Sequence, residues 1–218
     1  MPELKIAIVR HSITPGNMAM QYVGRTDQPL CTEGIELAKS YSKLMPEVER
    51  VYSSPLTRCK QTVAILFPAH EPQIAPGLIE CDFGKFEGMT QEELSRQPFF
   101  AEWKAQGGIM PFPGSGEDQE GFLLRCKTAF LNVIEELRGD RIKTAATVFH
   151  GGSIMAVMCS LGLPRMPFFE WRVKNSSGFM VKVTDENELE VEALLGNIED
   201  MPQKHLLAKQ KLPLAISR

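Results

Sequence analysis

The chain has 218 residues, 43% of them hydrophobic and 23% charged, a composition typical of a globular domain that buries an apolar core. Its 24 Lys and Arg residues against 27 Asp and Glu residues give a net charge of −3, which leaves no basic surface of the kind that nucleic-acid binding needs. No apolar stretch approaches the roughly 18 residues of a membrane-spanning helix, so neither nucleic acid nor a membrane is an expected partner.

The amino terminus and the cysteines indicate the cellular compartment in which the protein is expected. The opening stretch MPELKIAIVRHS has one lysine, a short apolar run and no small-residue cleavage site, unlike a signal peptide. The five cysteines are odd in number, widely spaced and without a C-x-x-C pair, which predicts neither a disulfide framework nor a zinc site. We therefore expect a cytoplasmic protein without a bound metal or another cofactor.

The first third of the chain predicts alternating strands and helices. Residues 4–10 form an apolar run typical of a buried strand, and residues 32–45 carry apolar side chains at helical spacing. Thr32 is a candidate cap for that helix. Residues 50–54 predict a second strand, and residues 55–66 predict a helix with its proline at the first position.

The rest of the chain continues this alternation after an interruption. Residues 90–118 hold short helical patterns broken by Pro and Gly, and we expect them to form an excursion over one edge of the sheet. The later predicted elements are a helix at 118–138, a strand at 144–149, a helix at 152–162 and a hairpin of strands at 178–184 and 188–195.

This order of elements predicts a three-layer α/β/α fold, with helices on both faces of a mainly parallel sheet and one antiparallel element. We expect residues 1–196 to form a single domain that includes the excursion at about 90–118. Residues 197–218 carry mixed charge and two prolines, and we expect this tail to wrap the surface or to be loose.

Four basic side chains are predicted to meet at one edge of this sheet. His11 and His150 each follow a predicted strand, and ligands of open α/β sheets bind beyond the carboxyl ends of the strands. Arg10 precedes His11, and Arg58 lies in the first turn of the helix that follows the second strand. Any one of them alone would be read as a structural residue. Two guanidinium groups beside two imidazoles, however, predict a pocket for a phosphate dianion.

Six motifs follow one another between Ile6 and about Ser177 in an order that is itself informative. They are RHSITPGN (10–17), GRTDQPLCTEG (24–34), SSPLTRCKQT (53–62), IECDFGKFEG (79–88), PGSGED (113–118) and HGGSIMA (150–156). In this order they resemble the histidine phosphatase superfamily, in the branch that holds the phosphoglycerate mutases, and are most similar to alpha-ribazole phosphatases and broad phosphomonoesterases. The resemblance implies a phosphoglycerate mutase-like fold.

The resemblance also implies a role for each matched residue. His11 would attack phosphorus and become a phosphohistidine, while a backbone carbonyl holds its other ring nitrogen. The groups that would hold the phosphoryl oxygens are Arg10, Arg58, His150 and Asn17, and Thr14 and Gly151 are further expected substrate contacts. No step requires a metal.

Several carboxylates compete for the role of proton donor. Glu80 stands at the position where the family has the group that protonates the leaving oxygen and later deprotonates the attacking water. Asp82 and Glu87 are rivals, although we expect them to be loop carboxylates that hold arginine or backbone N–H groups. Glu117 is expected to orient an arginine or a histidine from outside the site.

Departures from the family pattern bear on activity and substrate. Ser12 stands where the family has glycine, which would strain the backbone only if φ is positive there. Between Glu80 and Asp118 there is no adjacent pair of basic residues such as mutases use to grip a second phosphate. The bulky stretches FFAEW (99–103) and MPFP (110–113) would either line an apolar leaving-group pocket or pack the excursion.

We therefore expect a phosphohydrolase that cleaves small-molecule phosphomonoesters through a phosphohistidine. A phosphoglycerate mutase and a phosphate-binding regulator without turnover remain alternatives, the second supported by Ser12 alone. The oligomeric state is left open, with a homodimer as one alternative.

Overall fold

The centre of the fold is a mixed sheet, seen here in a computed structural model that describes residues 3–106 and 111–196. Within these residues the sheet has seven strands in the order β3-β2-β4-β1-β6-β7-β5. The strands are β1 (Leu4–Arg10), β2 (Arg50–Ser53), β3 (Gln73–Ile74), β4 (Thr144–Phe149), β5 (Gly162–Leu163), β6 (Gly178–Val183) and β7 (Leu189–Leu195). The pairs β1–β4, β2–β3, β2–β4 and β5–β7 are parallel, whereas β6 is antiparallel to both β1 and β7. This confirms the mainly parallel sheet with one antiparallel element.

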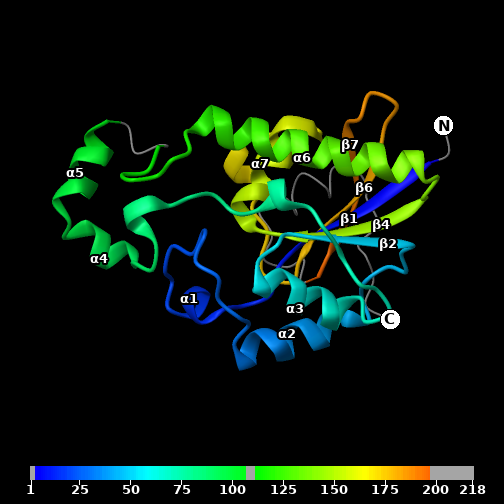
Figure 1. Ribbon diagram of the computed structural model, residues 1–218, viewed down its shortest axis with the longest axis horizontal. Coiled ribbons are helices and arrows are strands. Elements are labelled where there is room, and N and C mark those ends of the chain that lie inside the picture. The colour runs from blue at the N-terminus through cyan, green and yellow to red at the C-terminus, as the bar shows by residue number, and fades with distance from the viewer. Residues whose placement is uncertain (1–2, 107–110, 197–218) are drawn as a thin grey trace.

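Helices cover both faces of the sheet, which confirms the three-layer prediction. Figure 1 shows α6 and α7 on one face and α2 and α3 on the other. The α-helices are α1 (Pro15–Met18), α2 (Thr32–Ser42), α3 (Thr57–Leu66), α4 (Gln91–Ser95), α5 (Pro98–Ala105), α6 (Gln119–Gly139) and α7 (Gly151–Leu161), and the short 3-10 helices are η1 (Pro76–Leu78), η2 (Gly84–Phe86) and η3 (Phe168–Trp171). None of the helices in the described part of the chain has the length and apolarity needed to cross a membrane.

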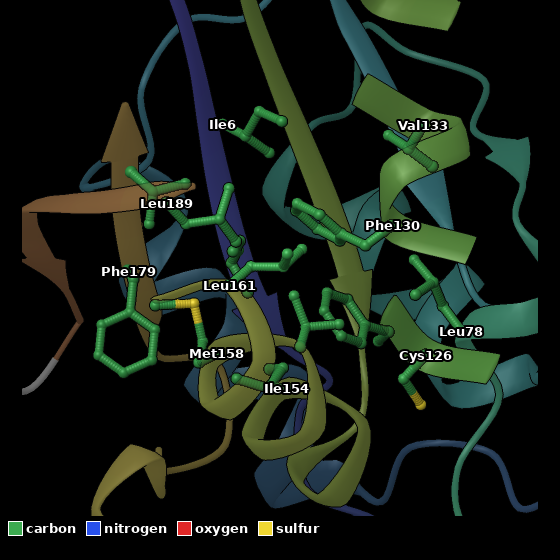
Figure 2. Close-up of a cluster of buried hydrophobic side chains, with 14 of the residues drawn as sticks. Ile6, Leu78, Cys126, Phe130, Val133, Ile154, Met158, Leu161, Phe179 and Leu189 are labelled. Atoms are coloured by element: carbon green, nitrogen blue, oxygen red, sulfur yellow. The ribbon is translucent and has the colours of Figure 1, made fainter. Parts of the chain in front are cut away.

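Strand β1 is apolar from Ile6 to Val9, as is typical of a strand with both faces buried. Ile6 and Ile8 belong to the core under α6 and α7, whereas Ala7 and Val9 belong to the core under α2 and α3. Figure 2 shows Phe130 of α6 in the same buried cluster as Ile6. Burying a side chain of this size stabilises the fold by about 1.5–3 kcal/mol, so the strand that carries the candidate site is among the most firmly held.

Two predicted helix starts are wrong by one or two residues. Thr32 is the first residue of α2 rather than its cap, because the Cys31 thiol accepts the capping hydrogen bond from the Gly34 N–H. Helix α3 begins at Thr57 with Leu56 as its cap, so the proline precedes the helix. Helix α1 and strands β3 and β5 were not predicted, because elements of two to four residues carry no measurable periodicity.

The excursion stands beyond the carboxyl ends of the parallel strands rather than over an edge of the sheet (Figure 1). Isolated backbone bridges join Gln21 to Thr90 and Tyr22 to Glu87, so α4 begins beside the loop that follows α1. This correction places the excursion next to the candidate site. The predicted tail at 197–218 lies outside the described residues.

Candidate active site

His11 lies at the carboxyl end of β1 in the state that a nucleophile requires. The ring is only 4% exposed, and its Nδ1 is 2.6 Å from the backbone oxygen of Ser12. Because a carbonyl can only accept a hydrogen bond, the proton resides on Nδ1 and Nε2 keeps a free lone pair. Burial, reinforced by the charges of Arg10 and Arg58, holds the pKa of His11 well below its usual range. The imidazole is therefore neutral at pH 7.

His150 and Arg58 are locked together beside His11. The two imidazole rings lie edge to face with their centroids 5.2 Å apart. Arg58 Nε donates to His150 Nδ1 at 3.2 Å, which leaves the His150 proton on Nε2, where it is donated to the Ser54 hydroxyl at 2.7 Å. The remaining Arg58 nitrogens donate to the carbonyls of Gly24 and Thr26. A phosphoryl oxygen that accepts a hydrogen bond from His150 Nε2 would replace the Ser54 hydroxyl.

Arg10 provides a donor that the protein leaves unused. Its Nη1 donates to the Val173 carbonyl at 3.0 Å. Its Nε is buried, and nothing in the described part of the chain accepts a hydrogen bond from it. A Cβ at Gly151 would lie 3.3 Å from this Nε, so the glycine leaves room for the guanidinium. A buried N–H without a partner is costly, and a phosphoryl oxygen would satisfy it.

Glu80, from the motif at 79–88, lies beside the first residues of α7. Its carboxylate is 6% exposed and lies at the amino terminus of α7, the helix that His150 caps. It accepts hydrogen bonds from the backbone N–H groups of Gly152 (2.9 Å) and Ser153 (3.1 Å). Gly152 has no space for a side chain, because a Cβ there would lie 2.5 Å from Glu80 Oε1. Glu80 is thus the candidate acid nearest to the two histidines along this helix end.

The rival carboxylates hold loops. Asp82 accepts from the N–H groups of Gly84 and Gly116. Glu87 accepts from three successive backbone N–H groups, those of Gly24, Arg25 and Thr26, and from the Thr26 hydroxyl. These are the loop-holding contacts expected of both. Glu80 differs from both, because its carboxylate binds the first N–H groups of α7, directly after His150.

Glu117 acts on Glu80 through an arginine that the sequence did not reveal. Its carboxylate pairs with both Nε (2.6 Å) and Nη2 (2.9 Å) of Arg125 on α6. Arg125 Nη1 in turn donates to the carbonyls of Gly77 and Ile79, just before Glu80. Arg125 is therefore the arginine that Glu117 holds in position. Arg125 was missed because nothing in a helical pattern marks one arginine among several.

Ser12 fits the backbone without strain. It is not among the described residues with positive φ, and its hydroxyl donates to the Gly34 carbonyl at 2.6 Å. Its N–H donates to the Thr62 hydroxyl at 2.9 Å. Thr14, expected as a substrate contact, is fully buried and caps α1, and its hydroxyl accepts a hydrogen bond from the Asn17 N–H.

Asn175, in the loop before β6, also belongs to the site. Its amide nitrogen donates to the His11 carbonyl (3.0 Å) and to Asn17 Oδ1 (3.2 Å). The next residue, Ser176, has a φ of 58° and donates its N–H to the Arg10 carbonyl. This loop fixes the backbone of the nucleophile. Sequence reasoning missed it, since a polar loop far along the chain carries no sign of where it folds.

A pocket of about 560 Å³ opens beside Arg10. It is lined by Arg10, Asn17, Met20, Gln21, Tyr22, Gln91, Arg172 and Asn175. The aromatic residues of the excursion do not line it. Phe99, Phe100, Trp103 and Phe112 instead surround Phe86, with ring centroids 5.0–6.0 Å from it. Among residues 3–106 and 111–196, no group of His, Cys, Asp or Glu side chains is arranged to hold a metal ion.

Known proteins resemble this chain in sequence and in fold. The profile of the histidine phosphatase superfamily (branch 1) matches residues 6–194. A broad-specificity phosphatase of Saccharomyces cerevisiae is 24% identical over 207 residues, covering 91% of this chain and 87% of that protein. A 2,3-bisphosphoglycerate-dependent phosphoglycerate mutase of Afipia carboxidovorans is 26% identical over 176 residues, covering 74% and 82%. The crystal structure of the alpha-ribazole phosphatase from Shigella flexneri superposes with a TM-score of 0.74 at 21% identity, covering 89% of this chain and 96% of that one, and shows the same fold.

Proposed function

We propose that this chain, which belongs to branch 1 of the histidine phosphatase superfamily, hydrolyses small-molecule phosphomonoesters through a phosphohistidine on His11. The observation that carries the proposal is the pairing of a neutral His11, whose Nε2 lone pair is free, with the unused buried donor Arg10 Nε. A nucleophile beside an unsatisfied cationic donor is suited to an anionic electrophile such as a phosphoryl group.

The reaction would take two steps. His11 Nε2 attacks phosphorus, the bond between phosphorus and the ester oxygen breaks, and Glu80 gives a proton to the leaving alcohol. Water then attacks the phosphohistidine, Glu80 takes its proton, and the bond to Nε2 breaks to release inorganic phosphate. Arg10 and Arg58 stabilise the negative charge on the transferring oxygens throughout, because Arg58 is fully buried and Arg10 offers a buried Nε that has no other hydrogen-bond partner in the described residues.

Hydrolysis is favoured over mutase chemistry by the basic residues of the excursion. Lys85 lies over the Phe99 ring and Lys104 over the Phe100 ring, each within about 5.5 Å of the ring centroid. Arg96, the C-cap residue of α4, pairs with Glu92 in the first turn of that helix. These three side chains are the bases between Glu80 and Asp118, and none of them lines the pocket beside Arg10. The described part of the segment between Glu80 and Asp118 thus offers that pocket no basic pair for a second phosphate.

The test is turnover of a panel of phosphomonoesters, with and without 2,3-bisphosphoglycerate. A phosphatase releases inorganic phosphate from several esters and does not need the bisphosphate. Conversion of 2-phosphoglycerate to 3-phosphoglycerate that depends on the bisphosphate, with little free phosphate, would identify a mutase instead. Phosphate binding with no turnover of any ester would identify the non-catalytic alternative.

A further inference from the structure

Arg58, which the proposed reaction uses to stabilise the transferring phosphoryl group, is held by one short loop. It is fully buried, and its Nη2 and Nη1 donate to the backbone carbonyls of Gly24 (2.7 Å) and Thr26 (2.8 Å). A guanidinium carries five N–H donors, so each Nη also has a second N–H for a phosphoryl oxygen. The direction of those N–H groups therefore depends on where residues 24–26 lie.

The Glu87 carboxylate fixes the opposite side of this loop. Its Oε1 accepts from the N–H groups of Gly24 (3.1 Å) and Arg25 (2.8 Å), and its Oε2 accepts from the Thr26 hydroxyl at 2.7 Å. A Cβ at Gly24 would lie 2.5 Å from Glu87 Oε1, so only glycine lets the carboxylate approach the loop this closely. Because Arg25 and Thr26 are exposed, burial of their side chains adds little, and these hydrogen bonds do most to hold the loop.

A single peptide group connects the two charged side chains. The peptide between Gly24 and Arg25 donates its N–H to Glu87, and its carbonyl accepts from Arg58. Hydrogen bonds to an ionised partner are roughly twice as strong as those between neutral groups, and two bonds on one peptide polarise each other. Burial lowers the pKa of Arg58, and nearby negative charges, that of Glu87 among them, act against this lowering. Glu87 thus acts on Arg58 through the peptide and through its charge.

We propose that Glu87 is a positioning residue that holds Arg58 in place for the phosphoryl group and so sets the affinity of the site for phosphate. This inference rests on the proposed function, because it takes Arg58 to bind the transferring group. Arg58 would bind the phosphoryl oxygens and not the alcohol, so the effect of Glu87 should be the same whichever alcohol leaves. That separates Glu87 from Glu80, whose effect as a proton donor depends on the leaving alcohol.

Glu87→Gln tests the inference, because it keeps the size of the side chain but removes its charge and one of its two accepting oxygens. We expect kcat/KM to fall by about tenfold, and equally on p-nitrophenyl phosphate and on glycerol 3-phosphate, since hydrogen bonds to a charged group are weakened. The dissociation constant of inorganic phosphate, measured by titration calorimetry, should rise by a similar factor. Circular dichroism shows whether the variant is folded at the temperature of the assays.

Glu49→Gln is the matched control, because Glu49 makes the same kind of contacts at the amino end of β4, the end of that strand away from His150. Its carboxylate accepts from the N–H groups of Lys143 (2.9 Å) and Thr144 (3.0 Å) and from the Thr144 hydroxyl. This substitution should lower the thermal stability but leave kcat/KM and the phosphate affinity within about twofold of wild type.

Thr26→Val is a second and milder variant, which tests the same link if Glu87→Gln does not fold. It removes one donor to Glu87 from an exposed side chain, and it should weaken phosphate binding by about threefold. An unchanged phosphate affinity in that variant would contradict the link.

The outcomes separate the inference from the proposed function. A folded Glu87→Gln protein that binds phosphate and hydrolyses both esters as wild type does, or as Glu49→Gln does, would overturn the inference and leave the phosphatase function standing. A loss confined to glycerol 3-phosphate would also overturn it, because Glu87 would then be a proton donor. A wild type that binds phosphate but releases none from any ester would overturn the phosphatase function, whereas weaker phosphate binding by Glu87→Gln would still support the positioning role.

Discussion

The phosphate site and the excursion are built in opposite ways. The site gathers buried charged and polar groups at the carboxyl ends of β1, β2 and β4, three neighbouring strands, and nearly every group is held by backbone atoms. The excursion gathers aromatic rings around Phe86, and Lys85 and Lys104 lie over two of these rings. The proposed chemistry therefore depends on the sheet, whereas the excursion supplies Gln91 to the wall of the pocket beside Arg10, where Tyr22 packs against Phe86.

Among substitutions that keep the nucleophile His11, Glu80→Gln should have the largest effect on the chemistry. We expect kcat/KM for alkyl phosphates to fall by about 10²–10⁴-fold, because these alcohols leave poorly without a proton. The loss on p-nitrophenyl phosphate should be much smaller, since its leaving group needs little protonation. Steady-state kinetics on both substrates measure the difference, with Asp82→Asn as the control for a neighbouring loop carboxylate. Equal losses on the two substrates in Glu80→Gln would move the acid role to Asp82 or elsewhere.

Phe86→Ala tests the other region, and its effect should fall on stability. Phe86 is fully buried among five aromatic rings, so we expect the free energy of unfolding to drop by about 3–5 kcal/mol. Turnover of p-nitrophenyl phosphate at low temperature should stay within about tenfold of wild type. Urea unfolding gives the first value, with Phe169→Ala, which removes a ring that is 66% exposed, as the control. Loss of turnover in a folded Phe86→Ala protein would show that the excursion takes part in the phosphoryl step.

Ser12→Gly should have the smallest effect. The variant loses the hydrogen bond to the Gly34 carbonyl, but the contact of His11 with residue 12 uses a backbone oxygen, which glycine keeps. We expect kcat/KM to change by less than about tenfold, or about 1.4 kcal/mol of barrier. The measurement is steady-state kinetics of both proteins on one ester. A wild type that is silent until Ser12→Gly restores activity by several orders of magnitude would make Ser12 an inactivating substitution.

The phosphate site was predictable because its signals are local. Arg10 and His11 are adjacent in sequence, and the ends of parallel strands share one edge of a sheet, so a strand pattern alone brings His11 and His150 together. The sheet could also be predicted, because the alternation of apolar runs and helical patterns is again a local signal in the sequence.

The residues that line the pocket beside Arg10 could not be predicted, because several of them lie in loops whose positions do not follow from local sequence. Asn175 and Arg172 reach the site from a segment more than 150 residues beyond His11, and their positions depend on how η3 and β6 are joined. The place of the excursion depends on two isolated backbone bridges, which leave no pattern in the sequence. The bulky aromatic residues of the excursion had two expected uses, an apolar pocket or packing of the excursion, and the structure shows them packed around Phe86.

Trapping the phosphorylated enzyme tests the proposed chemistry most directly. Wild-type protein and His11→Ala are mixed with a labelled phosphomonoester and quenched within milliseconds without acid, since phosphohistidine is acid-labile, and the modified peptide is identified by mass spectrometry. We expect phosphate on His11 of the wild type, no label on His11→Ala, and no turnover by a variant whose circular dichroism shows an intact fold. A fully active His11→Ala enzyme, or stoichiometric label on another residue, would contradict the phosphohistidine mechanism.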